Sequence, residues 1–229
     1  MNFGRKLRDF EEKLQANMKD VMCPTHLCIG QEAVPTALHS CIQPEDWLFS
    51  THRAHGHYMA KGGDMQRLWD EIMGKETGLN GGFAGSQSFS DETINFHCSA
   101  IVGGLVGVAV GAALALRLNR SKAIVVCCIG DAGTEQGVFW EALNFSVLHK
   151  LPIAFICENN GKSVDSHIWE RQAIPVKERV MAFGVRVTKS VQAAVGAARH
   201  RVPSFYEEKC TLLCDHLNMS VMMPTVDYA

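Results

Sequence analysis

The sequence predicts an α/β protein in which helices pack on both faces of a mainly parallel sheet. Residues 123–129 and 153–157 are short apolar stretches with the length of buried strands. Residues 134–149 lie between them and have apolar side chains at helical spacing, and Pro152 prevents this helix from continuing. A strand–helix–strand unit of this kind has parallel strands joined by a right-handed crossover.

The other elements are predicted in order along the chain. The apolar side chains of residues 3–20 fall on one stripe, which indicates an amphipathic helix within the amino-terminal segment 1–22. Asp64 is expected to cap a later helix. The apolar run at 101–116 predicts a buried helix, because it is too short and too rich in glycine to cross a membrane. The remaining expected elements are helices at 30–42 and 192–200, a glycine-rich loop at 78–86, a polar loop at 161–171, and strands at 184–188 and 204–213.

Charge and cysteine content argue against several classes of protein. The chain has 22 basic and 24 acidic residues and no basic cluster, so nothing supports binding to nucleic acid or to an anionic membrane. Nine cysteines are an odd number, and those at 127, 128 and 157 lie within apolar strands, which indicates reduced core residues. The amino terminus has no apolar signal segment, and we expect a cytoplasmic location.

Polar side chains follow both central strands of the predicted unit. Asp131 comes directly after the first strand and Asn160 shortly after the second. Because the carboxyl ends of parallel strands meet at one edge of a sheet, these side chains are expected to lie together. Their hard oxygen atoms suit Mg²⁺ or Ca²⁺, and Gly130 and Gly133 let the backbone approach phosphate groups. The pattern therefore predicts a Mg²⁺–diphosphate site. The alternative is an ordinary turn in which Asp131 only caps the next helix.

Motifs along the chain add a family resemblance. Gly130-Asp131-Ala132, followed by Asn159-Asn160, is similar to the thiamine-diphosphate motif, a Gly-Asp-Gly sequence followed by paired asparagines. Further motifs lie in family order at 26–33, 50–57, 101–104, 137–144 and 151–160. Together they resemble the alpha subunit of two-subunit 2-oxoacid dehydrogenases of the pyruvate, branched-chain and acetoin types. The resemblance implies a three-layer thiamine-diphosphate-binding fold over residues 23–216, a short tail at 217–229, and a chain that is shortened at its carboxyl end.

The resemblance also implies roles for individual residues. The cofactor-binding residues would be His52, Arg53, Ala100, Val102, Gly103, Gly130, Asp131, Ala132, Gly133 and Asn160. The magnesium ligands would be Asp131, Asn160 and the backbone carbonyl of Lys162. The catalytic histidines would be His26, His55 and His216.

The implied function is that of an oxidoreductase component. The chain would anchor Mg²⁺ and thiamine diphosphate for decarboxylation of a 2-oxoacid and transfer of the acyl group, with a lipoyl acyltransferase as a candidate acceptor. In this family the glutamate that activates the cofactor comes from a separate beta subunit. The resemblance therefore implies an α₂β₂ heterotetramer with active sites between the subunits.

Three alternatives stay open at the level of sequence. One is a non-oxidative two-subunit thiamine-diphosphate enzyme of the transketolase or ligase kind. Another is a degenerate, non-catalytic scaffold subunit, because Ala132 replaces a glycine and relatives commonly have lysine near Phe83 and Met-His near 87–88. The third is a metal-dependent hydrolase built on the histidine cluster at 52–57.

Overall fold

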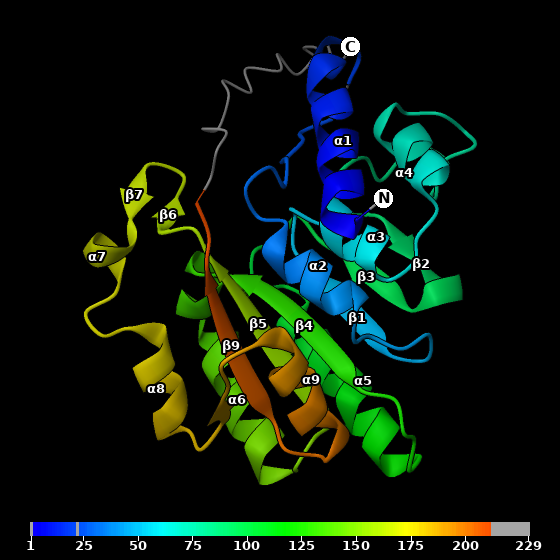
Figure 1. Cartoon of the computed structure of the whole chain (residues 1–229). Coiled ribbons are helices and arrows are strands. Elements are labelled where there is room, and N and C mark those ends of the chain that lie inside the picture. Colours follow the sequence, from blue (N-terminus) through cyan, green and yellow to red (C-terminus); the bar gives the residue numbers. More distant parts are fainter. Residues whose placement is uncertain (1, 22, 212–229) are drawn as a thin grey trace, which may run out of the picture.

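The computed structural model describes residues 2–21 and 23–211, and its centre is a seven-stranded sheet. The strand order is β2-β3-β1-β4-β5-β9-β8, and the long strands β4, β5 and β9 lie side by side in the middle (Figure 1). Every neighbouring pair in this sheet is parallel except β2 with β3. The prediction of an α/β protein with a mainly parallel sheet is confirmed. His216 and the segment 217–229 lie outside the described residues.

The sheet strands are β1 (Trp47–Ser50), β2 (Ser90–Asp91), β3 (Phe96–Cys98), β4 (Val125–Gly130), β5 (Ile153–Asn159), β8 (Arg186–Val187) and β9 (Ser204–Lys209). The longer helices are α1 (Phe3–Ala16), α2 (Ala33–His39), α3 (His55–Ala60), α4 (Met65–Ile72), α5 (Val106–Leu118), α6 (Gly137–Leu148), α8 (Val176–Ala182) and α9 (Val191–Arg199). Short 3₁₀ helices are η1 (Met18–Asp20), η2 (Glu92–Ile94) and η3 (Ala132–Glu135).

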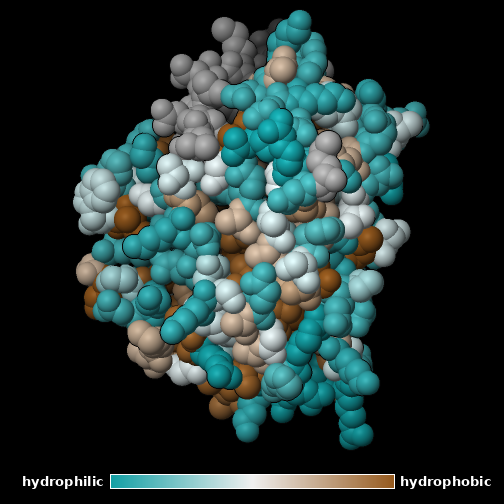
Figure 2. Space-filling view, viewed as in Figure 1, coloured by the Kyte–Doolittle hydropathy of each residue, from teal (hydrophilic) through white to brown (hydrophobic). Residues whose placement is uncertain are grey.

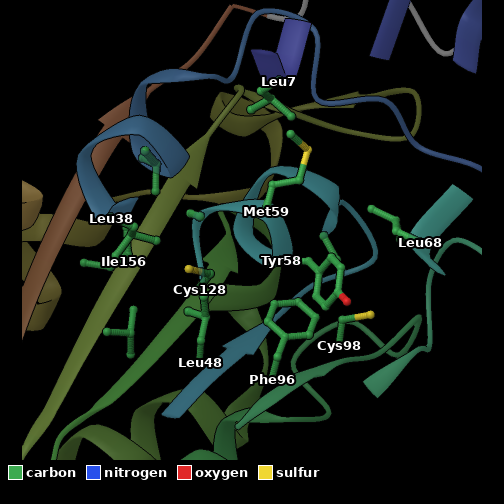
Figure 3. Close-up of a cluster of buried hydrophobic side chains, with 14 of the residues drawn as sticks. Leu7, Leu38, Leu48, Tyr58, Met59, Leu68, Phe96, Cys98, Cys128 and Ile156 are labelled. Carbon is green, nitrogen blue, oxygen red and sulfur yellow. The ribbon is translucent and has the colours of Figure 1, made fainter. Parts of the chain in front are cut away.

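Two hydrophobic clusters cover the two faces of the sheet. Val126 and Cys128 of β4 pack with side chains of α1, α2, α3 and α9. Their neighbours Val125 and Cys127 pack with α5, α6 and α8. This alternation along one strand is the reason that a central parallel strand must be apolar throughout. Figure 3 shows part of the first cluster, where Tyr58 and Phe96 meet beside Leu48, with Cys128 and Ile156 on neighbouring strands of the same face. The expected three-layer arrangement is confirmed.

The amino-terminal helix packs on this chain. Leu7 and Leu14 of α1 are fully buried in the first cluster, as the apolar stripe predicts. Glu11, on the same helix, is also fully buried, and its carboxylate accepts hydrogen bonds from the Cys28 backbone N–H at 2.6 Å and the His55 ring at 2.8 Å. Both apolar burial and a buried polar contact therefore hold α1 to the sheet.

Several element boundaries differ from the prediction. The stretch expected as one helix at 134–149 divides into η3 and α6, and the run at 101–116 becomes helical only from Val106. The segment expected as a polar loop contains the hairpin β6 (Lys162–Ser163) and β7 (Ser166–His167) and the short helix α7 (Ile168–Arg171). The cap at Asp64 is confirmed, since its carboxylate accepts from the N–H groups of Gln66 and Arg67.

Surface hydropathy agrees with this packing. In Figure 2 the apolar residues of the visible face lie in small areas between hydrophilic ones. Across the described part of the chain, no helix is both long enough and apolar enough to cross a membrane.

We expect Arg199→Ala to lower the free energy of unfolding by about 2 kcal/mol. The Asp46 carboxylate is fully buried and accepts from Arg199 at 2.6 and 3.1 Å, so the substitution leaves a buried charge without its cation. Urea unfolding followed by circular dichroism measures the change. Arg201→Ala, which removes an exposed arginine two residues later, is the matched control and should change stability by less than about 0.5 kcal/mol. Equal losses in the two variants would contradict a role for the ion pair.

Candidate functional site

A cavity of about 260 Å³ opens at the carboxyl ends of β1, β4 and β5. Its walls come from the residues that follow these strands, from the segment at 100–106 and from residues 162–164. In open parallel sheets this edge is where ligands bind, because the strand ends and the following loops leave a crevice there. The cavity is thus in the place that the strand–helix–strand pattern predicts.

The structure brings most of the predicted site residues to this one cavity. The residues from the prediction that line it are His26, His52, Arg53, Ala100, Val102, Gly103, Gly130, Asp131, Ala132, Gly133, Asn160 and Lys162. They come from five separate stretches of the chain.

His55 lies elsewhere, and its predicted catalytic role has no support from its position. The side chain is fully buried, with Nδ1 at 2.8 Å from Glu11 Oε1 and Nε2 at 2.8 Å from Ser86 Oγ. Both ring nitrogens are bound to protein groups, and His55 is not among the residues of the cavity wall. A general acid or base must reach its substrate, so we correct this assignment to a structural one.

The histidine cluster does not converge on a single point. The His52 ring lies 4.6 Å from the His26 ring, whereas His55 faces Glu11. His57 is buried, with Nδ1 at 2.8 Å from Ser50 Oγ and Nε2 at 3.2 Å from Glu158 Oε2. Because the three histidines have different partners, they do not form one shared metal site, and the hydrolase alternative stays a prediction without support from this cluster.

Arg53 contributes a buried positive charge to the cavity wall. The residue is 8% exposed, and its guanidinium donates to the backbone carbonyl of Leu27. That acceptor is neutral, and within the described residues no carboxylate forms an ion pair with Arg53. A guanidinium held in this way can bind an anionic group through its planar fork of N–H donors.

Asp131 is held by an arginine that the sequence pattern did not identify. Its carboxylate is 2% exposed, and Oδ2 accepts from Arg171 Nη2 at 2.7 Å. Arg171 also pairs with Glu135. Burial raises the pKa of the Asp131 carboxyl, and the Arg171 guanidinium acts in the opposite direction. The Asp131 side chain makes no capping hydrogen bond to η3, so the alternative in which it only caps the next helix is wrong.

The paired asparagines shape the chain after β5. Asn160 Oδ1 accepts from the Lys162 backbone N–H at 2.9 Å, and Asn159 Oδ1 accepts from Gly161 N–H at the same distance. These are local turns that the Asn-Asn-Gly sequence favours. They bring Asn160 and Lys162 to the same cavity as Asp131.

The backbone of the cavity has room for a ligand where glycine is present. A Cβ on Gly130 would meet no atom within 4 Å. Gly103 has φ of +77°, a conformation that favours glycine, and its Cβ would lie only 3.1 Å from Gln136 Cγ. A carboxylate, a carboxamide, a carbonyl and a buried arginine around open space fit a divalent cation with a diphosphate.

Two other residues of the site lacked a usable signal in the sequence. Gln87 Nε2 lies 2.6 Å from His26 Nδ1, which is 61 positions away in the chain. Gln172 Nε2 lies 2.9 Å from Glu135 Oε1 and 3.3 Å from the Asp131 carbonyl. Arg171 and Gln172 are about 40 positions from their partners, and no periodicity connects such distant residues.

Comparison with known proteins agrees with this geometry. A model of the dehydrogenase E1 component family matches residues 4–200. The chain is 38% identical over 159 residues to the alpha subunit of acetoin:2,6-dichlorophenolindophenol oxidoreductase from Bacillus subtilis, covering 68% of this chain and 48% of that protein. It is 36% identical over 163 residues to the pyruvate dehydrogenase E1 component subunit alpha of Zymomonas mobilis, covering 70% and 46%.

A plant relative is similar over the same region. The identity to the mitochondrial pyruvate dehydrogenase E1 component subunit alpha-1 of Oryza sativa is 34% over 151 residues, which is 66% of this chain and 39% of that protein. The chain thus spans about half the length, or less, of these curated relatives. The family match covers most of the chain, including the cavity at the carboxyl ends of the central strands, and the chain therefore belongs to the dehydrogenase E1 component family.

Proposed function

We propose that this chain is the alpha part of a thiamine-diphosphate-dependent 2-oxoacid dehydrogenase and that its cavity holds the cofactor's diphosphate with Mg²⁺. The observation that carries this proposal is the convergence of Arg53, Asp131 and Asn160 on one cavity. Each residue follows a different parallel strand, β1, β4 or β5. An ordinary turn gives no reason for an arginine, a carboxylate and a carboxamide to meet at one edge of the sheet.

The proposed metal ligands are Asp131, Asn160 and the Lys162 carbonyl. Mg²⁺ prefers such oxygen donors and completes its octahedron with phosphate oxygens and water. Arg53 would bind the diphosphate, and the absence of a side chain at Gly130 leaves space for it. The segment at 100–103 would lie beside the rings of the cofactor.

Thiamine diphosphate, when bound, supplies the carbanion chemistry that removes CO₂ from a 2-oxoacid and leaves an activated acyl group. The contribution of this chain is to bind, to orient and to transfer protons. We assign proton transfer to His26 and His52, whose rings are in edge contact at the cavity. When the Gln87 amide nitrogen donates to His26 Nδ1, the neutral ring has its proton on Nε2.

A beta subunit is the proposed partner, in an α₂β₂ assembly. The matched relatives are named as alpha subunits, which supports a second type of chain. The surface of α5 and α6 supports the same proposal, because its exposed side chains include Val108, Leu118 and Leu148, at 55%, 69% and 71% exposure. Ile101 is 71% exposed and also lines the cavity, so an exposed apolar side chain lies at the site itself.

The acyl acceptor, the substrate and the cellular location are also predictions from the sequence. We expect a lipoyl acyltransferase as acyl acceptor, a 2-oxoacid as substrate and a cytoplasmic location. The relative from Oryza sativa is named as mitochondrial. The proposed binding of Mg²⁺ and thiamine diphosphate at the cavity does not depend on them.

The test is calorimetric titration of thiamine diphosphate with Mg²⁺ into the chain, alone and with the beta subunit. We expect binding that tightens with the partner and falls at least about 100-fold in Asp131→Ala, because the metal loses its only carboxylate among the proposed ligands. Asp20→Ala removes an exposed carboxylate and is the matched control. Binding that survives Asp131→Ala would contradict the proposed metal site.

A non-catalytic scaffold is the second candidate function. The observation in its favour is that Arg171 already neutralises Asp131 inside the site. This candidate predicts that the chain associates with the beta subunit but binds no cofactor, so the same titration separates the two functions.

A further inference from the structure

Arg171 lies between two carboxylates at the edge of the cavity. Its Nη2 is 2.7 Å from Asp131 Oδ2, and its Nη1 pairs with Glu135. The exposed fractions of the three side chains are 13% for Arg171, 2% for Asp131 and 25% for Glu135. Gln172 adds hydrogen bonds to Glu135 and to the Asp131 carbonyl. The end of α7 is thus bound directly to a proposed metal ligand.

This clamp, formed by Arg171 and Gln172, leaves buried polar atoms unsatisfied. Within the described residues, Arg171 Nε and Gln172 Oε1 are buried and have no hydrogen-bond partner. A buried polar atom without a partner has lost its hydrogen bonds to water and forms none with the protein, which costs free energy. The clamped arrangement is therefore less favourable than its ion pairs suggest, and another cation can replace it.

The charges around Arg171 indicate which kind of cation could replace it at Asp131. Asp131 and Glu135 together have two negative charges, and Arg171 supplies one positive charge to the pair. A divalent cation brings twice the positive charge of the guanidinium to Asp131 and suits its oxygen atoms. Arg171 occupies Oδ2 of Asp131, so a cation that binds this oxygen displaces the guanidinium, and a cation at the other oxygen lies beside its positive charge. In both cases the two cations compete at Asp131.

We propose that Arg171 is an internal counter-ion that competes with Mg²⁺ for Asp131 and so sets the metal requirement of the site. This inference rests on the proposed function, because the competing ion is the metal of the cofactor. Arg171 ends the segment that begins directly after Asn160 and contains β6, β7 and α7. Release of Arg171 therefore frees the segment that also supplies the Lys162 carbonyl, and metal binding is coupled to its movement.

The coupling between Mg²⁺ binding and release of Arg171 lowers the apparent affinity of the site for Mg²⁺. If only a fraction of the molecules have Asp131 free of Arg171, the apparent dissociation constant is the intrinsic one divided by that fraction. A variant without the guanidinium should then require less Mg²⁺, roughly tenfold less if about one molecule in ten is unclamped.

The first measurement needs neither metal nor cofactor. Hydrogen–deuterium exchange of amides 161–172 is compared in the wild-type chain, Arg171→Gln, Arg171→Lys and Arg186→Gln. We expect faster exchange in Arg171→Gln and an intermediate rate in Arg171→Lys, which keeps the charge but not the planar fork. Arg186 is exposed on β8 and gives a matched loss of charge. Thermal unfolding confirms that each variant is folded, and unchanged exchange in Arg171→Gln would overturn the clamp.

The second measurement is the Mg²⁺ concentration that gives half-maximal binding of thiamine diphosphate, with the beta subunit present. A decrease of roughly tenfold in Arg171→Gln, with Arg186→Gln unchanged, supports the inference. If the wild type binds and Arg171→Gln binds with the same Mg²⁺ requirement, the inference fails and the proposed function stands. If no variant binds the cofactor, the proposed function fails, and the competition with Mg²⁺ fails with it.

Discussion

Replacing Glu71 by alanine is expected to lower the free energy of unfolding by about 4 kcal/mol. The Glu71 side chain is fully buried at the end of α4. Its carboxylate accepts four backbone hydrogen bonds between 2.6 and 3.1 Å, from the N–H groups of Asn80, Gly82, Ala84 and Gly85. The substitution leaves all four donors without their acceptor.

The glycine-rich loop at 78–86 is wrapped around this one carboxylate. A Cβ on Gly78 would lie 2.6 Å from Glu71 Oε2, and a Cβ on Gly82 would lie 2.4 Å from the Gly74 carbonyl carbon. The chain can approach so closely only because these residues are glycine. The loop leads to Gln87, which lies 2.6 Å from His26 at the cavity, so its order also matters for the site.

Urea unfolding measures this loss, with Glu76→Ala as the control. Glu76 is exposed and lies five positions further along the chain, so its removal should change stability by less than about 0.5 kcal/mol. Glu71→Gln should fall between the two, because an amide oxygen accepts less strongly than a carboxylate. A loss below about 1 kcal/mol in Glu71→Ala would show that the loop does not depend on this residue.

Replacing Gly130 by valine is expected to weaken thiamine-diphosphate binding by at least about 100-fold while the fold is retained. A Cβ at this position meets no atom within 4 Å, and the residue lines the cavity at the end of β4. The added methyl groups would therefore occupy space that the diphosphate needs. Valine is favoured in strands, so stability should change by less than about 1 kcal/mol.

Calorimetry and urea unfolding of the same preparation separate the two effects. Gly196→Val is the matched control, because a Cβ on Gly196 in α9 also meets no atom within 4 Å and the residue does not line the cavity. It should keep the cofactor affinity of the wild type. Undiminished binding in Gly130→Val would mean that the diphosphate lies elsewhere.

Much of the fold could be predicted because its signals are local. Apolar runs with strand length give β4 and β5, and Pro152 ends the helix before β5. Because the carboxyl ends of two parallel strands meet at one edge of the sheet, the residues after β4 and β5 predict that Asp131 and Asn160 lie together there. The amphipathic stripe of α1 was equally clear, but only the structure shows that α1 packs on this chain.

Element boundaries and histidine roles were less accessible. The break between η3 and α6 and the hairpin β6–β7 depend on contacts with other elements, which no window of sequence contains. His26 and His55 are both histidines within family motifs, yet one lines the cavity and the other is buried against Glu11. Residue type and motif indicate which side chains could act in catalysis, but burial decides whether a substrate can reach those side chains.

By itself, the sequence determined the fold class, the family and the residues that gather at the cavity, because periodicity, turn residues and motif spacing act over short stretches of chain. Only the tertiary structure decided that Arg171 neutralises Asp131 and that Glu71 holds the glycine-rich loop. The Arg171–Asp131 pair joins positions 40 residues apart, and the Glu71 contacts depend on how the loop closes after α4. Such contacts form where packing brings charges and N–H groups together in a site that excludes water, and this has no local signature in a chain.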